Sequence, residues 1–296
     1  TKSSRFKNNN IETVSENRLV VNFEKREPRY KVLHLFVPGT RQLTILPLIT
    51  LKNIFVEDIE LDIDFDIPFH HQSVYAKNEK IYLIGGVRDK RATNCYSYVL
   101  DTNTLQPQAP MKEKTRLNPG VIVIQDFIFV MGGGYESPYK AAFRSCEVYD
   151  TKEDTWTTIA DMNYRVVNAS FCSFNEEAIY RIGGVNELGS IINNIEKYDI
   201  ATNTWRVLYY LLKENEISFF KNSFSVQINE EQILVFGGMN NKGEITNQTY
   251  IINSAHQKED MEELELVEKY SPSVFLFEYP EPNKIMVSHR EVVFLS

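Results

Sequence analysis

The chain has 296 residues, 43% of them hydrophobic and including 18 Phe and 16 Tyr, which is enough apolar material for a substantial core. This composition excludes a disordered chain and favours strands over helices. A formal net charge of −8 argues against nucleic-acid binding as the main role, because phosphate recognition requires a basic surface.

Three cysteines, Cys95, Cys146 and Cys172, are spread through the chain without a CxxC motif or an even pairing. Neither a disulfide framework nor a zinc site is indicated, and a reducing, cytoplasmic setting fits best. No apolar run approaches the ~20 residues of a membrane-spanning helix, so we expect no membrane insertion. The sequence begins at Thr1 and shows neither a signal peptide nor an initiating Met, so we allow for a region upstream of Thr1.

In chain order, the first unit is expected to contain strands at 19–23, 30–36, 42–47 and 59–65. The last of these lies in the run 57–66, where acidic and apolar residues alternate. Asp62, Asp64 and Asp66 have the spacing of a calcium loop, but the central Gly and the closing Glu of such a loop are absent. We therefore predict an outer strand with one solvated acidic face.

A short phrase of apolar or β-branched residues ended by a glycine pair then recurs along the chain. Its copies are KIYLIGG at 80–86, FIFVMGG at 127–133, AIYRIGG at 178–184 and QILVFGG at 232–238. Degenerate copies at 31–36 and 284–289 extend the series to six, with a period of about 50 residues. Each copy predicts a buried strand that runs into a tight turn where backbone approaches backbone.

Three further strands accompany each phrase. A strand with small residues precedes it, at 71–75, 119–122, 168–171 and 222–225, and a third strand follows it, at 96–101, 146–150, 195–199 and 249–253. The fourth strand carries Trp156, Trp205 or, in the same place, Leu105. The acidic cluster 259–268 is expected to form the fourth strand of the fifth unit, with Leu264 and Leu266 as strand residues.

Four antiparallel strands in each of six units predict an all-β, six-bladed β-propeller that forms one domain over 1–296. The expected blades are 19–67, 68–111, 112–162, 163–210, 211–268 and, last, 269–296 together with 5–14. The last unit offers only three strands, at 273–278, 284–287 and 291–295. Because an unpaired blade edge is prone to aggregation, we predict that a strand within 5–14 completes this blade and closes the ring.

The motif of a glycine pair, a Tyr that closes the third strand and a following Trp resembles the kelch repeat. Gly132 and Gly133 with Tyr149 and Trp156 match it in full, and so do Gly183 and Gly184 with Tyr198 and Trp205. The copies with Tyr98 and Leu105, and with Tyr250, match it in part. The first and last units lack the glycine pair, so their assignment as blades depends on spacing and strand pattern.

This resemblance implies a non-enzymatic protein–protein interaction module without a cofactor. Many kelch propellers are the substrate receptors of ubiquitin-ligase adaptors, and others are scaffolds in cytoskeletal or ciliary assemblies. The alternative is an enzyme built on a propeller, such as a sugar mutarotase or a copper oxidase, and metal analysis of the purified protein would discriminate between them. The pair His70 and His71 has no further ligand at metal-binding spacing, and the glycines at 132–134 lack the pattern of a phosphate loop.

Basic and aromatic residues are concentrated in the loops between second and third strands and between consecutive blades, which share one rim in the kelch layout. The candidate partner-binding residues are Arg88, Lys90, Arg91, Lys114, Arg116, Tyr135, Tyr139, Arg144, Tyr164 and Arg165. This rim suits an acidic segment or surface of a protein partner. Kelch repeats often carry a basic residue after the fourth strand, so a purely structural role for Arg116 and Arg165 is the alternative. We expect oligomerisation only through regions outside this chain.

Overall fold

A computed structural model defines the arrangement of most of the central part of the chain. It describes residues 32–47, 57–87, 95–113, 116–135, 141–210, 221–240, 242–245, 249–253 and 263–270. Every regular element within these ranges is a β-strand, so the all-β prediction is confirmed.

The strands form five consecutive antiparallel units. The first three are β1 (Val32–Phe36), β2 (Gln42–Pro47) and β3 (Glu57–Glu60); β4 (Phe69–Tyr75), β5 (Lys80–Val87), β6 (Cys95–Val99) and β7 (Thr104–Pro107); and β8 (Gly120–Ile124), β9 (Phe127–Met131), β10 (Cys146–Asp150) and β11 (Thr155–Ile159). The fourth and fifth are β12 (Ser170–Phe174), β13 (Ala178–Ile182), β14 (Ile195–Asp199) and β15 (Thr204–Tyr210); and β16 (Phe224–Gln227), β17 (Gln232–Phe236), β18 (Thr249–Asn253) and β19 (Glu263–Tyr270). The recurring phrase forms the second strand of the second to fifth units.

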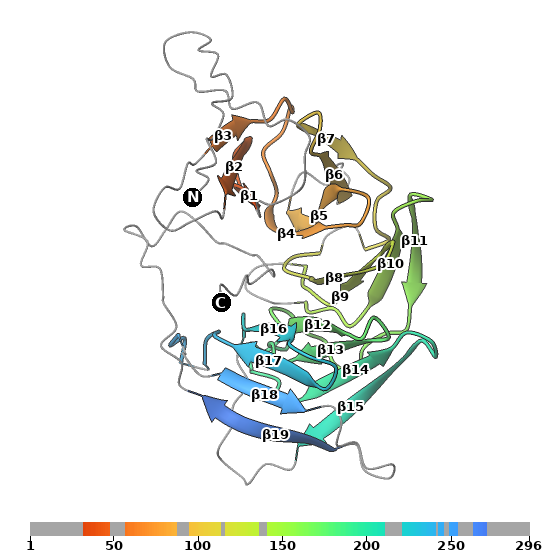
Figure 1. The fold of residues 1–296 in the computed structure, drawn as a ribbon, viewed down its shortest axis with the longest axis vertical. Coiled ribbons are helices and arrows are strands. Elements are labelled where there is room, and N and C mark those ends of the chain that lie inside the picture. The colour runs from red at the N-terminus through yellow and green to blue at the C-terminus, as the bar shows by residue number, and fades with distance from the viewer. Residues whose placement is uncertain are drawn as a thin grey trace, which may run out of the picture.

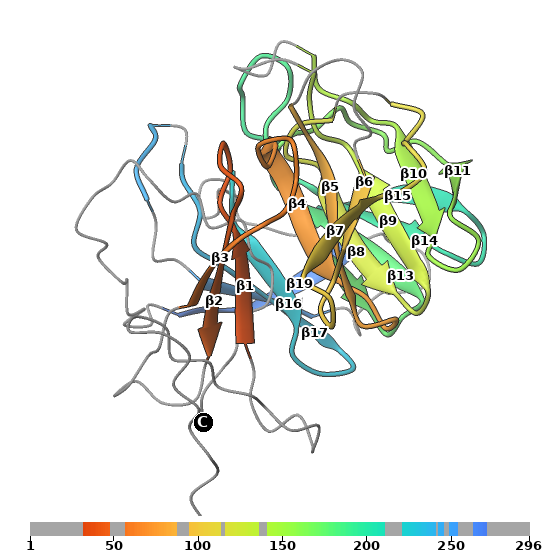
Figure 2. The same ribbon diagram turned by 90° about the horizontal axis from the view of Figure 1, so that it is seen from above.

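The five units follow one another along an arc, as wedges around a common centre (Figure 1). The first strands β4, β8, β12 and β16 lie innermost and neighbour one another in that order, whereas β7, β11, β15 and β19 lie on the outside. The view from above shows the same succession of inclined sheets (Figure 2). A short parallel pairing between β15 and β19 also joins the outer strands of the fourth and fifth units.

The predicted sixth unit and the ring closure lie outside the described residues. This holds for the expected strands at 273–278, 284–287 and 291–295 and for the closing segment within 5–14, and the strand at 19–23 expected in the first unit lies outside the described residues too. The closed six-bladed ring therefore stays a prediction.

The acidic strand of the first unit differs from the prediction. Pairing with β2 ends at Glu60, and the chain then leaves the sheet instead of continuing as a strand to residue 65. The reason is that Leu61 and Ile67 are both buried, and their backbone N–H groups donate to the carbonyls of Arg41 and Thr40. The acidic side chains of this run are exposed, as expected.

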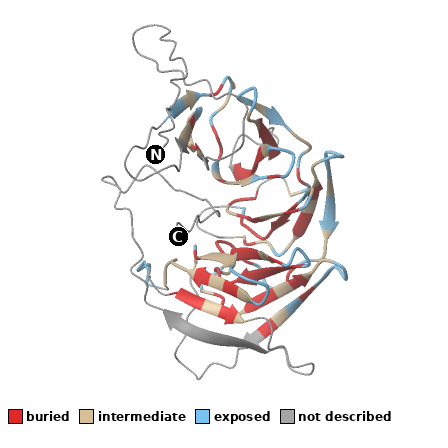
Figure 3. Ribbon diagram, viewed as in Figure 1, coloured by how far each residue is buried: buried red, intermediate tan, exposed pale blue. Residues whose placement is uncertain are grey.

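The apolar core lies between units and not within a single sheet. In β9, Ile128 and Val130 point into the cluster shared with the second unit, whereas Phe129 and Met131 point into the cluster shared with the fourth. Alternate residues of a strand point to opposite faces, so one apolar phrase serves two interfaces. Figure 3 shows this burial on the inner strands, while β7 and β11 are largely exposed.

The glycine pair lets the connections that enter and leave the unit pack directly on the end of the second strand. Gly132 and Gly133 have φ values of 59° and 87°, where side chains are strained. A Cβ atom on either residue would lie 2.7 Å from a backbone carbonyl oxygen, that of Val166 or that of Leu117. The glycines are therefore required by this close approach of backbones.

Candidate functional site

The loops between second and third strands and the connections between units meet on one rim of the molecule. In the third unit, Gly134 bridges to Leu117 of the incoming connection and to Ala142 of the loop. The fourth unit repeats this arrangement at Val185, which bridges to Val167 and Ile191. In both units, backbone bridges therefore hold the incoming connection and the loop between the second and third strands together on this rim.

A buried guanidinium closes the base of the loop in the third unit. Arg116 is fully buried and pairs with Glu147 at 3.0 Å (Nη2 to Oε1). Its Nη1 donates to the carbonyls of Gly132 at 2.7 Å and Ser145 at 2.9 Å, which are the two ends of the loop. The Phe143 ring lies 5.5 Å from the guanidinium carbon. Arg116 therefore fastens the loop at its base.

The fourth unit contains the same arrangement with a different arginine. Arg181 of β13 is fully buried and pairs with Glu196 at 2.8 Å (Nη2 to Oε2). Its Nη1 donates to the carbonyls of Gly183 and Asn194, both at 3.0 Å. The centroid of the Tyr164 ring lies 5.8 Å from the guanidinium carbon of Arg181. This loop too is fastened at its base by a buried ion pair.

The connections that enter the third and fourth units differ in the residue that faces the buried guanidinium site. The Gly86 N–H donates to the Arg116 carbonyl and the Gly133 N–H to the Val166 carbonyl, so Val166 takes the place of Arg116 in the fourth unit. Val166 is buried there and Arg181 supplies the guanidinium, whereas Arg165, one residue before Val166, is exposed.

The structure corrects one of the predicted partner-binding residues. Arg116 is fully enclosed and neutralised by Glu147, so its position matches the structural alternative and it is not available on the rim. Tyr135, Arg144, Tyr164 and Arg165 are exposed. The remaining candidates, Arg88, Lys90, Arg91, Lys114 and Tyr139, lie outside the described residues.

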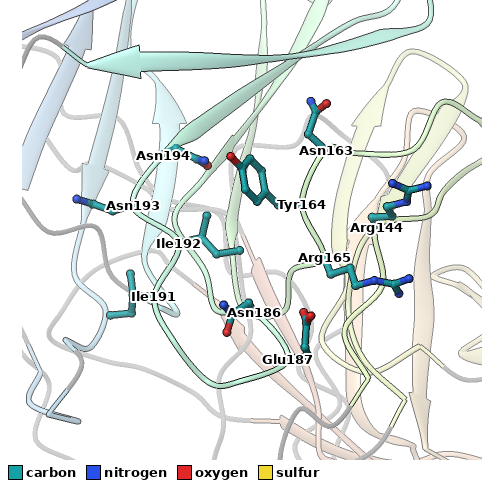
Figure 4. A pocket seen from close by; sticks show the side chains of 10 residues that line it. All are labelled: Arg144, Asn163, Tyr164, Arg165, Asn186, Glu187, Ile191, Ile192, Asn193 and Asn194. Atoms are coloured by element: carbon teal, nitrogen blue, oxygen red, sulfur yellow. The ribbon is translucent and has the colours of Figure 1, made fainter.

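Three of the exposed candidates, Arg144, Tyr164 and Arg165, line one open pocket of about 540 Å³ between the third and fourth units (Figure 4). Sequence reasoning missed the other residues of its wall, which are Asn163, Asn186, Glu187, Ile191, Ile192, Asn193 and Asn194. A usable signal was the pattern Asn-x-x-Gly-x, which occurs in the same loop of two units, at 186–190 and 240–244.

The two arginines of the pocket differ in how far their charge is compensated. Arg144 forms an ion pair with Asp161 at 3.2 Å, and both side chains are exposed. Arg165 donates from Nη1 to the Ala142 carbonyl at 3.2 Å, and within the described residues no carboxylate pairs with it. Arg165 is therefore the stronger candidate for binding an external anion.

Within the described ranges, no group of three or more His, Cys, Asp or Glu side chains is arranged to hold a metal ion. The free cysteines are buried, and burial raises the pKa of the Cys146 thiol to about 12. His71 is buried next to the Pro68 carbonyl, which lies 2.7 Å from its Nδ1. The three cysteines pack in separate core clusters, and neither they nor His71 line the pocket.

The repeated four-stranded units, their glycine pairs and the shared rim define a protein of the kelch-type propeller class. The family model described as the Attractin/LZTR1 beta-propeller matches residues 81–264, from β5 into β19. The chain belongs to this propeller family, whose kelch repeats typically form protein-interaction modules.

Similar proteins include Protein C13 of Swinepox virus (strain Kasza), with 25% identity across 79% of this chain and 54% of that protein. Kelch-like protein 38 of Mus musculus is 26% identical over 58% of this chain and 29% of its own length. Kelch-like protein 7 of Rattus norvegicus is 39% identical over 22% of this chain and 11% of its own length. The chain thus spans about half of the swinepox protein and smaller shares of the other two. Within the described part, no helix is long and apolar enough to span a bilayer.

Proposed function

We propose that this protein is a non-catalytic interaction module that docks an acidic segment or surface of a partner protein on its loop rim. The observation that carries this proposal is the pocket between the third and fourth units, where Arg144, Tyr164 and Arg165 are exposed together. Tyr and Arg are the side chains most often found at the energetic centres of interfaces.

The fastened loops support the proposal because binding to a rigid surface requires little ordering. Arg181 holds both ends of the loop that carries Asn186 and Asn194, and the Tyr164 ring packs over the same guanidinium. The Glu196 carboxylate also accepts the backbone N–H of Asn163 at 2.7 Å. The wall of the pocket is thus held by a buried network before any partner arrives.

In the cell, this module would act as the substrate receptor of a ubiquitin-ligase adaptor or as a scaffold in a cytoskeletal or ciliary assembly. Both roles use the same rim, and they differ in what the rest of the protein contains. A dimerising domain upstream of Thr1 in the complete protein favours the adaptor, whereas purification from a filament or an axoneme favours the scaffold.

The test is quantitative affinity capture with the complete protein and with a rim variant, Arg88→Glu, Arg91→Glu and Arg165→Glu. Arg116 is left unchanged because its replacement would disrupt the core. The matched control reverses three exposed charges away from this rim, Lys77→Glu, Lys152→Glu and Arg206→Glu, on the β4–β5 turn, the β10–β11 turn and β15.

We expect at least one partner whose recovery falls about tenfold or more with the rim variant and is retained with the control, because each paired charge contributes to affinity. Both variants should unfold within a few degrees of the natural protein, because the ion pairs that the control removes, Lys77 with Glu176 and Lys152 with Asp126, are exposed. Equal recovery of every partner with both variants would show that the rim is not the docking surface.

A further inference from the structure

Two positive side chains lie opposite each other on the outer strands of the fourth unit. Lys197 of β14 pairs in register with Arg206 of β15, so both side chains point to the same face of the sheet. Arg206 is exposed and Lys197 is half-buried. Because side chains directly opposite each other on antiparallel strands have Cβ atoms only about 5 Å apart, these two like charges repel each other.

Within the described part of the chain, the protein supplies no anion to this pair. Neither Lys197 nor Arg206 forms an ion pair or a hydrogen bond there. The Lys197 Nζ lies 5.7 Å from the centroid of the Tyr180 ring, and the buried Tyr180 hydroxyl has no hydrogen-bond partner among the described residues. Burial is the main cause that lowers the pKa of Lys197, and the Arg206 charge adds to it, while Asp199 and Glu177 only partly offset both.

The equivalent positions of the two preceding units are uncharged. In each unit these positions come directly before the motif tyrosine of the third strand and directly after the Trp or Leu of the fourth. They pair in the same register and hold Val148 with Thr157 in the third unit and Ser97 with Gln106 in the second. The fold therefore does not require a cation at either place, and among these three units the charge pair belongs to the fourth alone.

We propose that Lys197 and Arg206 together bind a phosphate dianion. A dianion neutralises both charges, whereas a carboxylate leaves one of them uncompensated. The Arg206 guanidinium presents a planar fork to two phosphate oxygens, and the Lys197 ammonium supplies a point charge to a third. The site lies on the outer strands, away from the loop rim, so it adds a ligand to the proposed docking function and does not depend on it.

The test titrates the complete protein, labelled with ¹⁵N in its arginine side chains, with inorganic phosphate, glycerol 3-phosphate and acetate. The ionic strength is kept constant with chloride, at about pH 7.5, where phosphate is mostly a dianion. We expect phosphate to shift the Arg206 Nε–H signal and to bind about tenfold or more tightly than acetate. Tighter binding of glycerol 3-phosphate than of phosphate assigns the site to phosphate monoesters, and the reverse order assigns it to free phosphate.

Two variants take the residues of the third unit, which the fold is known to accommodate. Lys197→Val and Arg206→Thr should each weaken phosphate binding about tenfold or more, as measured by the rise in unfolding temperature that phosphate causes. In chloride alone neither variant should lower the unfolding temperature, because each relieves the repulsion between the two cations. The control, Lys152→Gln, removes an exposed charge on the β10–β11 turn and should bind phosphate as the natural protein does.

Equal binding of phosphate and acetate overturns the inference, and so does the absence of any response to phosphate. A rise in unfolding temperature that is as large in Lys197→Val and Arg206→Thr as in the natural protein overturns it too. These results are separate from the proposed function, because the rim variant leaves Lys197 and Arg206 unchanged. Partner capture that is lost in the rim variant keeps the docking rim even when phosphate does not bind.

Discussion

The third and fourth units place a guanidinium at the same point of the fold but take it from different parts of the chain. Arg116 reaches the site from the connection before β8, whereas Arg181 reaches it from inside β13. In both units the group binds the first glycine carbonyl and a glutamate of the third strand. The fold thus fixes the place of the charge and leaves its sequence position free.

The difference changes what is left at the surface. In the third unit the connection sends its arginine inward, and in the fourth it leaves Arg165 outside, where it lines the pocket. The pairing is also more complete in the fourth unit, because Arg181 Nε donates to Glu196 at 3.0 Å, while Arg116 Nε has no hydrogen-bond partner among the residues that the structure describes. In the fourth unit the buried guanidinium thus comes from the strand, and Arg165 of the connection is a separate, exposed charge.

Moving the buried arginine of the fourth unit from the strand to the connection tests the comparison with the largest expected effect on stability. Arg181→Val, which introduces the residue found at the equivalent Val130, leaves Glu196 buried without its cation. The free energy of unfolding should fall by about 3 to 5 kcal/mol. Adding Val166→Arg to this variant supplies a guanidinium from the connection, as in the third unit, and should recover at least half of the loss.

Urea unfolding followed by tryptophan fluorescence measures both changes. The control is Val166→Arg in the natural background, which adds a second arginine to an occupied site and should destabilise by about 1 to 3 kcal/mol through overpacking. A double variant no more stable than Arg181→Val alone would mean that the two guanidinium sites are not interchangeable.

Much of this fold could be predicted from the sequence because its signals are local. The glycine-ended phrases form β5, β9, β13 and β17, and the Tyr149 and Trp156 rings expected from the motif pack 4.9 Å apart. In each case neighbouring residues determine the outcome, through alternating burial and a turn that only glycine accommodates.

The site was predicted only in part because the direction of a side chain depends on distant residues. Arg116 and Arg165 are offset by one position in the two connections, because Val166 is the counterpart of Arg116, and the partner that buries Arg116 is Glu147, 31 residues away. Whether that inward place is already filled depends on Arg181, a lone charge within an apolar phrase. That charge was the available signal, because an arginine in a buried strand requires an acidic partner.

Tryptophan substitutions test a smaller part of the comparison, the bond from each unit to the one before it. The Trp156 Nε1 donates to the Ala109 carbonyl at 2.7 Å, and the Trp205 Nε1 donates to the Ala160 carbonyl at 3.0 Å. Trp156→Phe and Trp205→Phe should each cost about 1 to 2 kcal/mol, since a partly buried carbonyl loses its donor and some packing is lost. Thermal unfolding of the two variants should give similar losses, and a loss confined to one unit would contradict their equivalence.

The smallest expected effect extends the comparison to the second unit, where His71 takes the place of Pro119 and Ala169. Burial is the main cause that lowers the pKa of His71 below 6.5, so the folded protein keeps it neutral where the unfolded chain binds a proton. The stability that His71 contributes is therefore complete well above pH 6.5 and decreases as the pH falls through and below 6.5, by at most about 1.4 kcal/mol at about pH 5.5. His71→Ala should remove this part of the pH dependence in urea unfolding between about pH 7.5 and about pH 5.5, and an identical slope in both proteins would show that His71 is not its source.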